Sequence, residues 1–331
     1  MKDKMSSWLM AFVVGMFVPA ILISIAERIL PLPPKKTETE ITVATEPTEP
    51  TQGQQSTPGG TVAVLMSDGN TVIMDMNEYL TAVVLGEMPA DFEFEALKAQ
   101  AVVARTYALK CIASGSKHAN KTVCTNAACC QAYQPIEVYL ESGGKQSAVE
   151  KVRAAVNDTT GHVLTYNGAL IEATYFSCSG GRTEDALAVW GTDVPYLKAV
   201  DSPGEENAKW FTDRVRFSAA EFASRLQLVL TGSPSGWFGS VTRTSGGGVD
   251  TMEIGGVIFK GTELRQRLGL RSTAFSVTVV GELIYVSTKG YGHRVGMSQY
   301  GADAMALNGY GYTQILEHYY PGTVLESYLQ N

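Results

Sequence analysis

One segment in the first half of the chain carries an uninterrupted helical pattern that restricts what can pack around it. Apolar residues recur there at intervals of three and four, at Phe94, Leu97, Ala101, Ala104, Ala108 and Cys111. This spacing places them on one face of a helix that ends near residues 114–116. Because alanines let neighbours approach closely, we expect a sheet to pack against this face. Cys111 lies on the same stripe, which predicts a buried, inert thiol.

The segments on either side of this helix predict a mixture of short strands and further helices. Two alternating apolar runs flank the turn signal SDGN and predict a hairpin over residues 61–76. A helix over 77–88, ended by Pro89, is expected to follow. Other expected elements are helices at about 147–157 and at 217–230 with a Ser cap, two helices within 302–322, and strand pairs at 162–177 and 274–290. Strands and helices do not alternate in a βαβ rhythm, so the predicted fold class is α+β.

The N-terminus has the composition of a membrane anchor. No charged residue occurs across the 19 positions from Trp8 to Ala26, which is long enough for a helix to span a bilayer. Lys2 and Lys4 precede this run and predict a cytoplasmic N-terminus. A cleaved signal peptide is the alternative, with a shorter apolar run and a small-x-small cleavage site. We expect residues 1–30 to be an uncleaved transmembrane helix with its short cytoplasmic end, and the rest of the chain to lie outside the cytoplasm.

Residues 31–60 are expected to form a disordered linker. They are rich in Pro, Thr, Glu, Gln and Gly and have almost no large apolar side chains, so they cannot bury a core. Residues 61–331 are then the folded domain, a main lobe with a smaller lobe inserted at about 203–270. The net charge of −7 and the lack of a basic, aromatic-interleaved stripe argue against nucleic acid as a partner.

Four soft or borderline metal ligands cluster within 13 residues: His118, Cys124, Cys129 and Cys130. Thiolate and imidazole ligands suit a tetrahedral zinc site. A disulfide is the alternative, because disulfides persist outside the cytoplasm. Three clustered cysteines leave one unpaired, and a bridge between adjacent cysteines is strained. The pattern therefore favours a structural zinc site, which would hold Gln131 and Tyr133 beyond it at the edge of a cleft.

Other segments contain polar groups that either bind a ligand or only support the fold. Glu87 follows an apolar run, which raises a carboxyl pKa as a general acid requires, but its local sequence by itself favours an exposed glutamate at a helix end. Arg105 lies off the apolar stripe and faces a groove or solvent. The segment YFSCSGGRTED (175–185) offers backbone N–H groups to an oxygen-rich ligand. Within it, Cys178 is expected to be structural. His293 lies in a Gly-rich turn that suits ligand binding.

Several of these segments together resemble the characteristic blocks of the stage II sporulation protein D family. In order they are YLTAVVLGEMPADFEFEALKAQAVVARTYAL, YFSCSGGRTED, AVDSP, GLRSTAF and GYGHRVGMSQYGADAMA, and the resemblance covers about residues 61–328. It implies a peptidoglycan lytic transglycosylase that cleaves the β-1,4 bond between N-acetylmuramic acid and N-acetylglucosamine in peptide-stripped glycan strands. The product is a 1,6-anhydro sugar. The main lobe would be the catalytic lobe.

The same resemblance implies a place and partners for the activity. The protein would act in engulfment of the forespore, as a single-pass membrane protein with its catalytic domain between the mother-cell and forespore membranes. Stage II sporulation proteins P and M would be its partners. A non-catalytic protein that binds the cell wall and recruits an amidase is the alternative from another class.

The resemblance also assigns roles to individual residues. The family's catalytic acid corresponds to Glu87, and some members bind zinc at the Cys and His cluster. The implied cleft residues are Arg105, Tyr196, Lys198, Ser177, Ser179, Gly180, His293, Ser298 and Gln299. Two positions depart from the family pattern: Cys129 stands where His is common, and Arg294 stands where many members have Gly.

Overall fold

The computed structural model describes residues 60–115 and 117–328. The predicted membrane anchor, and the predicted linker apart from its last residue, lie outside the described residues. Within the described ranges, no helix is both long and apolar enough to cross a membrane.

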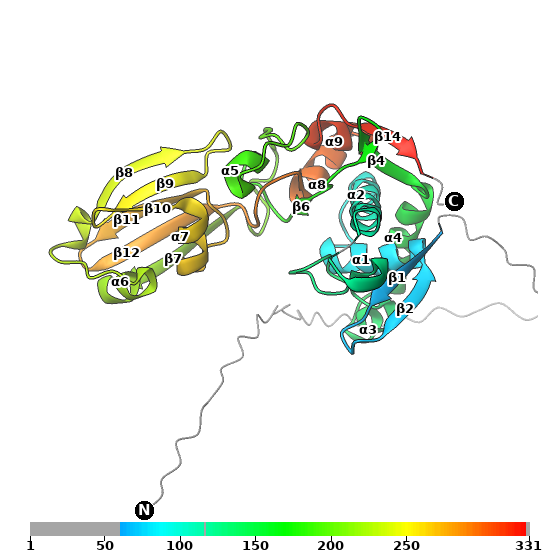
Figure 1. Cartoon of the computed structure of the whole chain (residues 1–331), viewed down its shortest axis with the longest axis horizontal. Coiled ribbons are helices and arrows are strands. Elements are labelled where there is room, and N and C mark those ends of the chain that lie inside the picture. Colours follow the sequence, from blue (N-terminus) through cyan, green and yellow to red (C-terminus); the bar gives the residue numbers. More distant parts are fainter. Residues whose placement is uncertain (1–59, 116, 329–331) are drawn as a thin grey trace, which may run out of the picture. The chain divides into compact units, whose positions relative to one another are not determined.

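Helix α2 (Phe94–Ala113) is the central element of the main core, and its prediction is confirmed. Figure 1 shows it nearly end-on among its neighbours. These are α1 (Met76–Glu87), α4 (Gln146–Asp158), α8 (Gln299–Leu307), α9 (Tyr312–Tyr319) and strand β4 (His162–Tyr166). Except for the last one, Ala113, the alanines of α2 are fully buried, which lets these neighbours approach closely. Helices rather than the expected sheet supply most of this contact.

The predicted N-terminal hairpin is confirmed. Strand β1 (Thr61–Leu65) pairs antiparallel with β2 (Thr71–Asp75), and β3 (Val123–Cys124) adds to β1 in parallel. The Asp75 side chain caps α1 by accepting hydrogen bonds from the N–H groups of Asn77 and Glu78. Helix α1 then carries Glu87 as its last residue, just ahead of Pro89.

The strand pair expected over 162–177 is confirmed only in its first part. Strand β4 forms a hairpin with β5 (Ala169–Leu170), and β14 (Val324–Ser327) pairs on the other side of β4. The following β6 (Tyr175–Phe176) pairs in parallel with β13 (Met297–Ser298) instead. This pairing brings the segment YFSCSGG beside the segment GHRVGMSQ, more than 100 residues later in the chain.

Shorter elements complete the main part. They are the 3-10 helix η1 (Ala119–Lys121), α3 (Ile136–Glu141) and α5 (Ala186–Trp190). The two expected C-terminal helices are α8 and α9. Together with the mixture of short strands, these helices agree with the α+β class.

A second core extends from Phe217 to Val286 and is distinct from the first. One of its sheets has the order β11-β12-β7 and the other the order β10-β9-β8. The elements are β7 (Thr212–Ser218), α6 (Ala219–Leu226), η2 (Pro234–Gly236), β8 (Phe238–Arg243), β9 (Val249–Ile254), β10 (Val257–Lys260), α7 (Gly261–Leu268), β11 (Phe275–Val280) and β12 (Leu283–Lys289). The lobe expected at about 203–270 does not include β11 and β12, which pack in this core.

Helix α6 is shorter than the predicted helix over 217–230. Ser218 caps it as expected, accepting a hydrogen bond from the N–H of Glu221. The helix ends at Leu226 because Gln227 adopts a left-handed conformation with φ of 59°. Phe217 belongs to strand β7, which pairs with β12.

Candidate functional site

Glu87 lies at the C-terminal end of α1 in a partly buried position. Its Oε1 accepts a hydrogen bond of 2.6 Å from the backbone N–H of Ala132 and one of 3.0 Å from the hydroxyl of Tyr175. Burial raises the pKa of Glu87, while the hydrogen bonds from Ala132, Tyr175 and the Gln299 side chain oppose this. A carboxyl held in this way stays protonated to higher pH than an exposed glutamate. It therefore suits a general acid.

The absence of a side chain at Gly86 brings the chain after the cysteine cluster against α1. A Cβ at this position would lie 3.2 Å from backbone atoms of Ala132, Tyr133 and Gln134. The N–H of Gln134 also donates a hydrogen bond of 2.9 Å to the carbonyl of Ala82. This close contact is what allows the N–H of Ala132 to reach Glu87.

Tyr175 and Gln131 extend the contacts of Glu87 into the core. The Tyr175 hydroxyl lies 3.0 Å from the side-chain oxygen of Gln131, and the side-chain nitrogen of Gln131 lies 3.2 Å from the Tyr79 hydroxyl. Gln131 is 1% exposed and Tyr79 is fully buried. Gln131 is therefore next to Glu87, but as a buried partner of tyrosines rather than as an open cleft residue.

Two predicted site residues at the start of α8 have different roles. Gln299 forms a side-chain hydrogen bond with Glu87, and its Nε2 lies 3.5 Å from Oε1 of the buried Gln100. Ser298 is fully buried and caps α8 through the N–H of Gly301. The structure brings Gln299 to Glu87 and gives Ser298 a role in the fold.

The SGG loop binds a carboxylate of the chain itself. The buried Glu205 accepts hydrogen bonds from the N–H groups of Ser179 and Gly180, at 2.7 and 3.3 Å. It also accepts from the hydroxyls of Ser179 and Ser202 and from the thiol of Cys178. The expectation that these N–H groups face an external ligand is therefore wrong: Glu205 is the oxygen-rich partner. Ser177 lies beside this loop, and its carbonyl accepts from the N–H of Tyr300.

Arg105 is buried, at 1% exposure, and so faces neither a groove nor solvent. Its guanidinium donates to the carbonyls of Val156 and Thr159 at the end of α4 and to that of His162. It also reaches the side chain of Asn77, at the opposite end of α1 from Glu87 and about 15 Å from it along the helix axis. The structure does not bring Arg105 to the carboxyl. Burial lowers the pKa of Arg105 to about 10.

The other predicted cleft residues have partners away from Glu87. The Tyr196 hydroxyl accepts a hydrogen bond from the N–H of Glu172, and Lys198 pairs with Asp185 and Asp193. Tyr133 stacks on Tyr79 and directs its hydroxyl to the sulfur of Met74.

His293 lies between the rings of Phe176 and Trp190, with centroids 5.6 and 5.4 Å away. Burial, with a smaller effect from Arg265, lowers its pKa to about 4. The imidazole is therefore neutral at neutral pH, and its Nδ1 accepts a hydrogen bond from the N–H of Val295.

The cysteine cluster can hold a metal ion. The ligand atoms of His118, Cys124, Cys129 and Cys130 all lie within 4.8 Å of one another. Nε2 of His118 lies 3.3 and 3.6 Å from the two adjacent sulfurs. A tetrahedral zinc with ordinary bond lengths separates its ligand atoms by about 3.5–3.8 Å, so the four residues fit zinc. All five cysteines, which lie in the described part of the chain, are free thiols.

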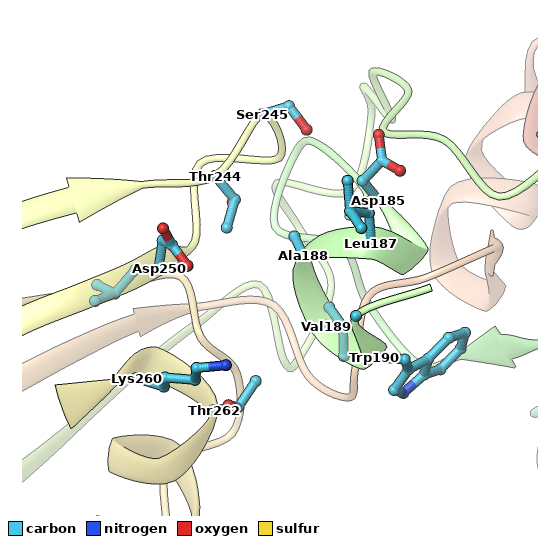
Figure 2. A pocket seen from close by; sticks show the side chains of 12 residues that line it. Asp185, Leu187, Ala188, Val189, Trp190, Thr244, Ser245, Asp250, Lys260 and Thr262 are labelled. Atoms are coloured by element: carbon cyan, nitrogen blue, oxygen red, sulfur yellow. The ribbon is translucent and has the colours of Figure 1, made fainter. Parts of the chain in front are cut away.

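A pocket of about 560 Å³ lies elsewhere, between α5 and the second core. Figure 2 shows Trp190 and Leu187 of α5 on one side and Asp250, Lys260 and Thr262 on the other. Of the candidate ligand-binding segments singled out above, only 175–185 reaches it, through its last residue, Asp185. The pocket is therefore separate from the contacts of Glu87.

Comparison with known proteins places these residues in a family. A model described as "Stage II sporulation protein" matches residues 69–166, which include Glu87 and the cysteine cluster. Stage II sporulation protein D of Bacillus subtilis is 40% identical over 253 residues, or 75% of this chain and 73% of the relative. The chain belongs to the stage II sporulation protein D family. The protein of the same name from Bacillus amyloliquefaciens is also 40% identical over 75% of the chain.

A third relative has a different name. The "Amidase enhancer" of Bacillus subtilis is 33% identical over 75% of this chain, which corresponds to 40% of that longer protein. Family membership thus agrees with the resemblance found in the sequence motifs.

Sequence reasoning missed Tyr175, Ala132 and Tyr79 as parts of the site. Ala132 contributes only a backbone N–H, which leaves no signal in the sequence. Tyr175 stands at the start of the segment YFSCSGG, where the cysteine and the glycines are more conspicuous. Its pairing with β13 could not be read from local periodicity.

Proposed function

We propose that this protein is a lytic transglycosylase that cleaves the β-1,4 bond between N-acetylmuramic acid and N-acetylglucosamine of peptidoglycan. The observation that carries the proposal is the partly buried Glu87, whose pKa is raised by burial and whose Oε1 accepts two hydrogen bonds. Among the described groups that shift this pKa, none is a second carboxylate. Hydrolytic glycosidases generally use two carboxylates, whereas this reaction needs one.

The reaction uses Glu87 twice. The protonated carboxyl donates its proton to the glycosidic oxygen as the bond from that oxygen to C1 of the muramic sugar breaks. The C6 hydroxyl of the same sugar then forms a bond to C1 and gives its proton to the carboxylate. The product is a 1,6-anhydromuramic end, no water is consumed, and Glu87 is protonated again for the next cycle.

The cysteine cluster acts on this site through the chain that follows it. We propose that His118, Cys124, Cys129 and Cys130 hold a structural zinc ion with no open position. Gln131 and Ala132 follow directly after Cys130 and contact the groups around Glu87. Bound zinc would hold Gln131 and Ala132 in place beside the groups around Glu87. Protein side chains would carry out every step of the reaction.

The family gives this activity a setting, which we also propose for this chain. The protein would act on peptide-stripped glycan during forespore engulfment, with stage II sporulation proteins P and M as partners. It would be anchored by residues 8–26, with the catalytic domain between the two membranes. The names of the Bacillus relatives support the sporulation role.

The mass of the glycan products tests the activity. Peptide-free glycan incubated with the wild-type protein should release fragments one water lighter than those of a hydrolase. Because a general acid contributes about 10²- to 10⁴-fold, Glu87→Gln should reduce the rate by at least about 100-fold while the variant stays folded. Anhydro products released by Glu87→Gln at the wild-type rate would refute the role of Glu87.

A second function has support from the similarity to the amidase enhancer. In this case the protein would bind the cell wall and stimulate an amidase without cleaving glycan. Wild type and Glu87→Gln would then stimulate a purified cell-wall amidase equally, and neither would release glycan fragments.

A further inference from the structure

When Glu87 is ionised, as it is after it has given up its proton, the hydrogen bonds between Glu87 and Tyr79 cannot all form with the side-chain amide of Gln131 in the orientation described above. The Tyr175 hydroxyl has one proton but lies 3.0 Å from two acceptor oxygens, Oε1 of Glu87 and Oε1 of Gln131. Whichever oxygen receives the proton, the other faces the phenolic oxygen without one. Such a contact is costly in a buried network, where polar groups are normally satisfied.

Turning the Gln131 amide by 180° resolves the conflict. Oxygen and nitrogen of a side-chain amide are nearly indistinguishable in shape, so their assignment follows from the hydrogen bonds. After the turn, the Tyr79 hydroxyl donates to Gln131, the Gln131 amide donates to Tyr175, and Tyr175 donates to Glu87. Each proton then has one acceptor, with the heavy-atom distances unchanged at 3.2, 3.0 and 3.0 Å.

We propose that Tyr175, directed by Gln131 and Tyr79, is a positioning residue that keeps Oε1 of Glu87 as an acceptor and places the catalytic proton on Oε2. This relay, defined as Tyr79, Gln131, Tyr175 and Glu87, rests on the proposed function for its catalytic meaning. Oε1 then accepts from both Ala132 and Tyr175, so both of its lone pairs are engaged. Oε2 is the oxygen that gives the proton to the glycosidic oxygen and takes it back from the C6 hydroxyl.

Tyr175 remains the hydrogen-bond donor to Glu87 as the pH changes. Burial raises the pKa of Tyr175 well above its usual value, so the phenol stays a donor. Three groups face Glu87 from neighbouring elements: Tyr175 from β6, the Ala132 N–H from the loop, and the Gln299 amide from α8. Of these, only Tyr175 can titrate. Losing its hydrogen bond therefore acts on Glu87 without adding or removing a neighbouring charge.

Replacement of Tyr175 by Phe in the full chain tests the relay. Without this donor the ionised form of Glu87 is less well stabilised, so its pKa should rise. The carboxyl NMR titration of Glu87 measures this directly and does not depend on activity. In the glycan assay the alkaline limb of the pH–rate profile should move upward, and the rate at its optimum should fall about tenfold, the effect of one hydrogen bond to a charged group.

Two further variants make the result specific. Gln131→Met keeps a similar volume but removes the amide, so Tyr175 loses the donor that directs its hydroxyl, and the pKa of Glu87 should rise by less than in Tyr175→Phe. Tyr312→Phe removes a hydroxyl that lies 3.2 Å from His162 and should leave both readouts unchanged.

The outcomes separate the relay from the proposed function. A folded Tyr175→Phe protein with the wild-type titration of Glu87 would overturn the relay. If the wild type releases no glycan fragments, the proposed function fails instead, and the NMR titration alone decides whether Tyr175 and Gln131 control Glu87.

Discussion

Arg294 and Glu184 form an ion pair of 3.2 Å in which both side chains are buried, with exposures of 2% and 0%. Arg294 adopts a left-handed conformation with φ of 67°, a region that glycine enters most readily. The pair joins three loops. Arg294 donates to the carbonyls of Ser179, Arg182 and Gly246, and Glu184 accepts from the Thr244 hydroxyl and the Gly248 N–H.

Breaking this pair should destabilise the protein strongly. Glu184→Gln leaves the buried guanidinium of Arg294 without its paired carboxylate, and the expected loss is about 3–5 kcal/mol in the free energy of unfolding. Urea unfolding measures it. The matched control is Glu221→Gln, which breaks an exposed pair with Arg225 and should cost less than about 1 kcal/mol. Equal losses for the two variants would contradict the buried pair's importance.

Arg105 should matter for stability and not for glycan binding. Arg105→Lys replaces a planar guanidinium that donates to several carbonyls by a single ammonium group, and the expected loss is about 2–4 kcal/mol. Arg153→Lys, in a more exposed pair with Glu78, is the control and should change stability little. If Arg105→Lys instead raised the KM for glycan and left stability unchanged, Arg105 would be a substrate-binding residue.

Stability should depend on the protonation of Glu87. Its folded-state pKa is raised, so the folded protein binds a proton more tightly than the unfolded chain. This contribution is complete below the pKa of an unfolded glutamate, about 4.3, and is lost as pH rises through the folded-state pKa. Glu87→Gln should therefore be more stable than wild type at neutral pH, and the difference should vanish near pH 3. A difference that is independent of pH would contradict the raised pKa.

Gly86 should be required for the contact between Ala132 and Glu87. In Gly86→Ala the added Cβ meets backbone at 3.2 Å, so residues 132–134 must move by a few tenths of an ångström. We expect a loss of about 1 kcal/mol in stability and a reduced rate of glycan cleavage. Gly236→Ala adds a methyl where nothing lies within 4 Å and should change neither quantity.

Metal removal should loosen the loop that contacts Glu87. We expect about one zinc ion per chain by elemental analysis, and a strong chelator should lower Tm. Cys130→Ser should lower both zinc content and Tm, whereas Cys111→Ala, outside the cluster, should keep the zinc. A chelator that stopped cleavage with no change in Tm would indicate a catalytic metal instead.

The elements set by local pattern could be predicted from the sequence. The apolar stripe of α2, the SDGN turn and the Ser218 cap each depend on residues close together in the chain, and all three are confirmed. The cluster that could hold a metal was also visible, because its members lie within 13 residues and their side chains have the chemistry of metal ligands. Glu87 was visible through its apolar surroundings and the family motif.

Contacts between distant segments were decided only by the tertiary structure. Tyr175 reaches Glu87 across 88 positions, and Glu205 occupies the SGG loop from 26 positions away. Because Arg105 lies off the apolar stripe of α2, its side chain was expected to face a groove or solvent. In the structure it is buried against the end of α4. A hydrogen bond between distant residues leaves no periodic trace in the sequence. The sequence by itself therefore determined the long helix α2, the turns and the candidate metal ligands, whereas the partners of each buried polar group depended on how those elements pack.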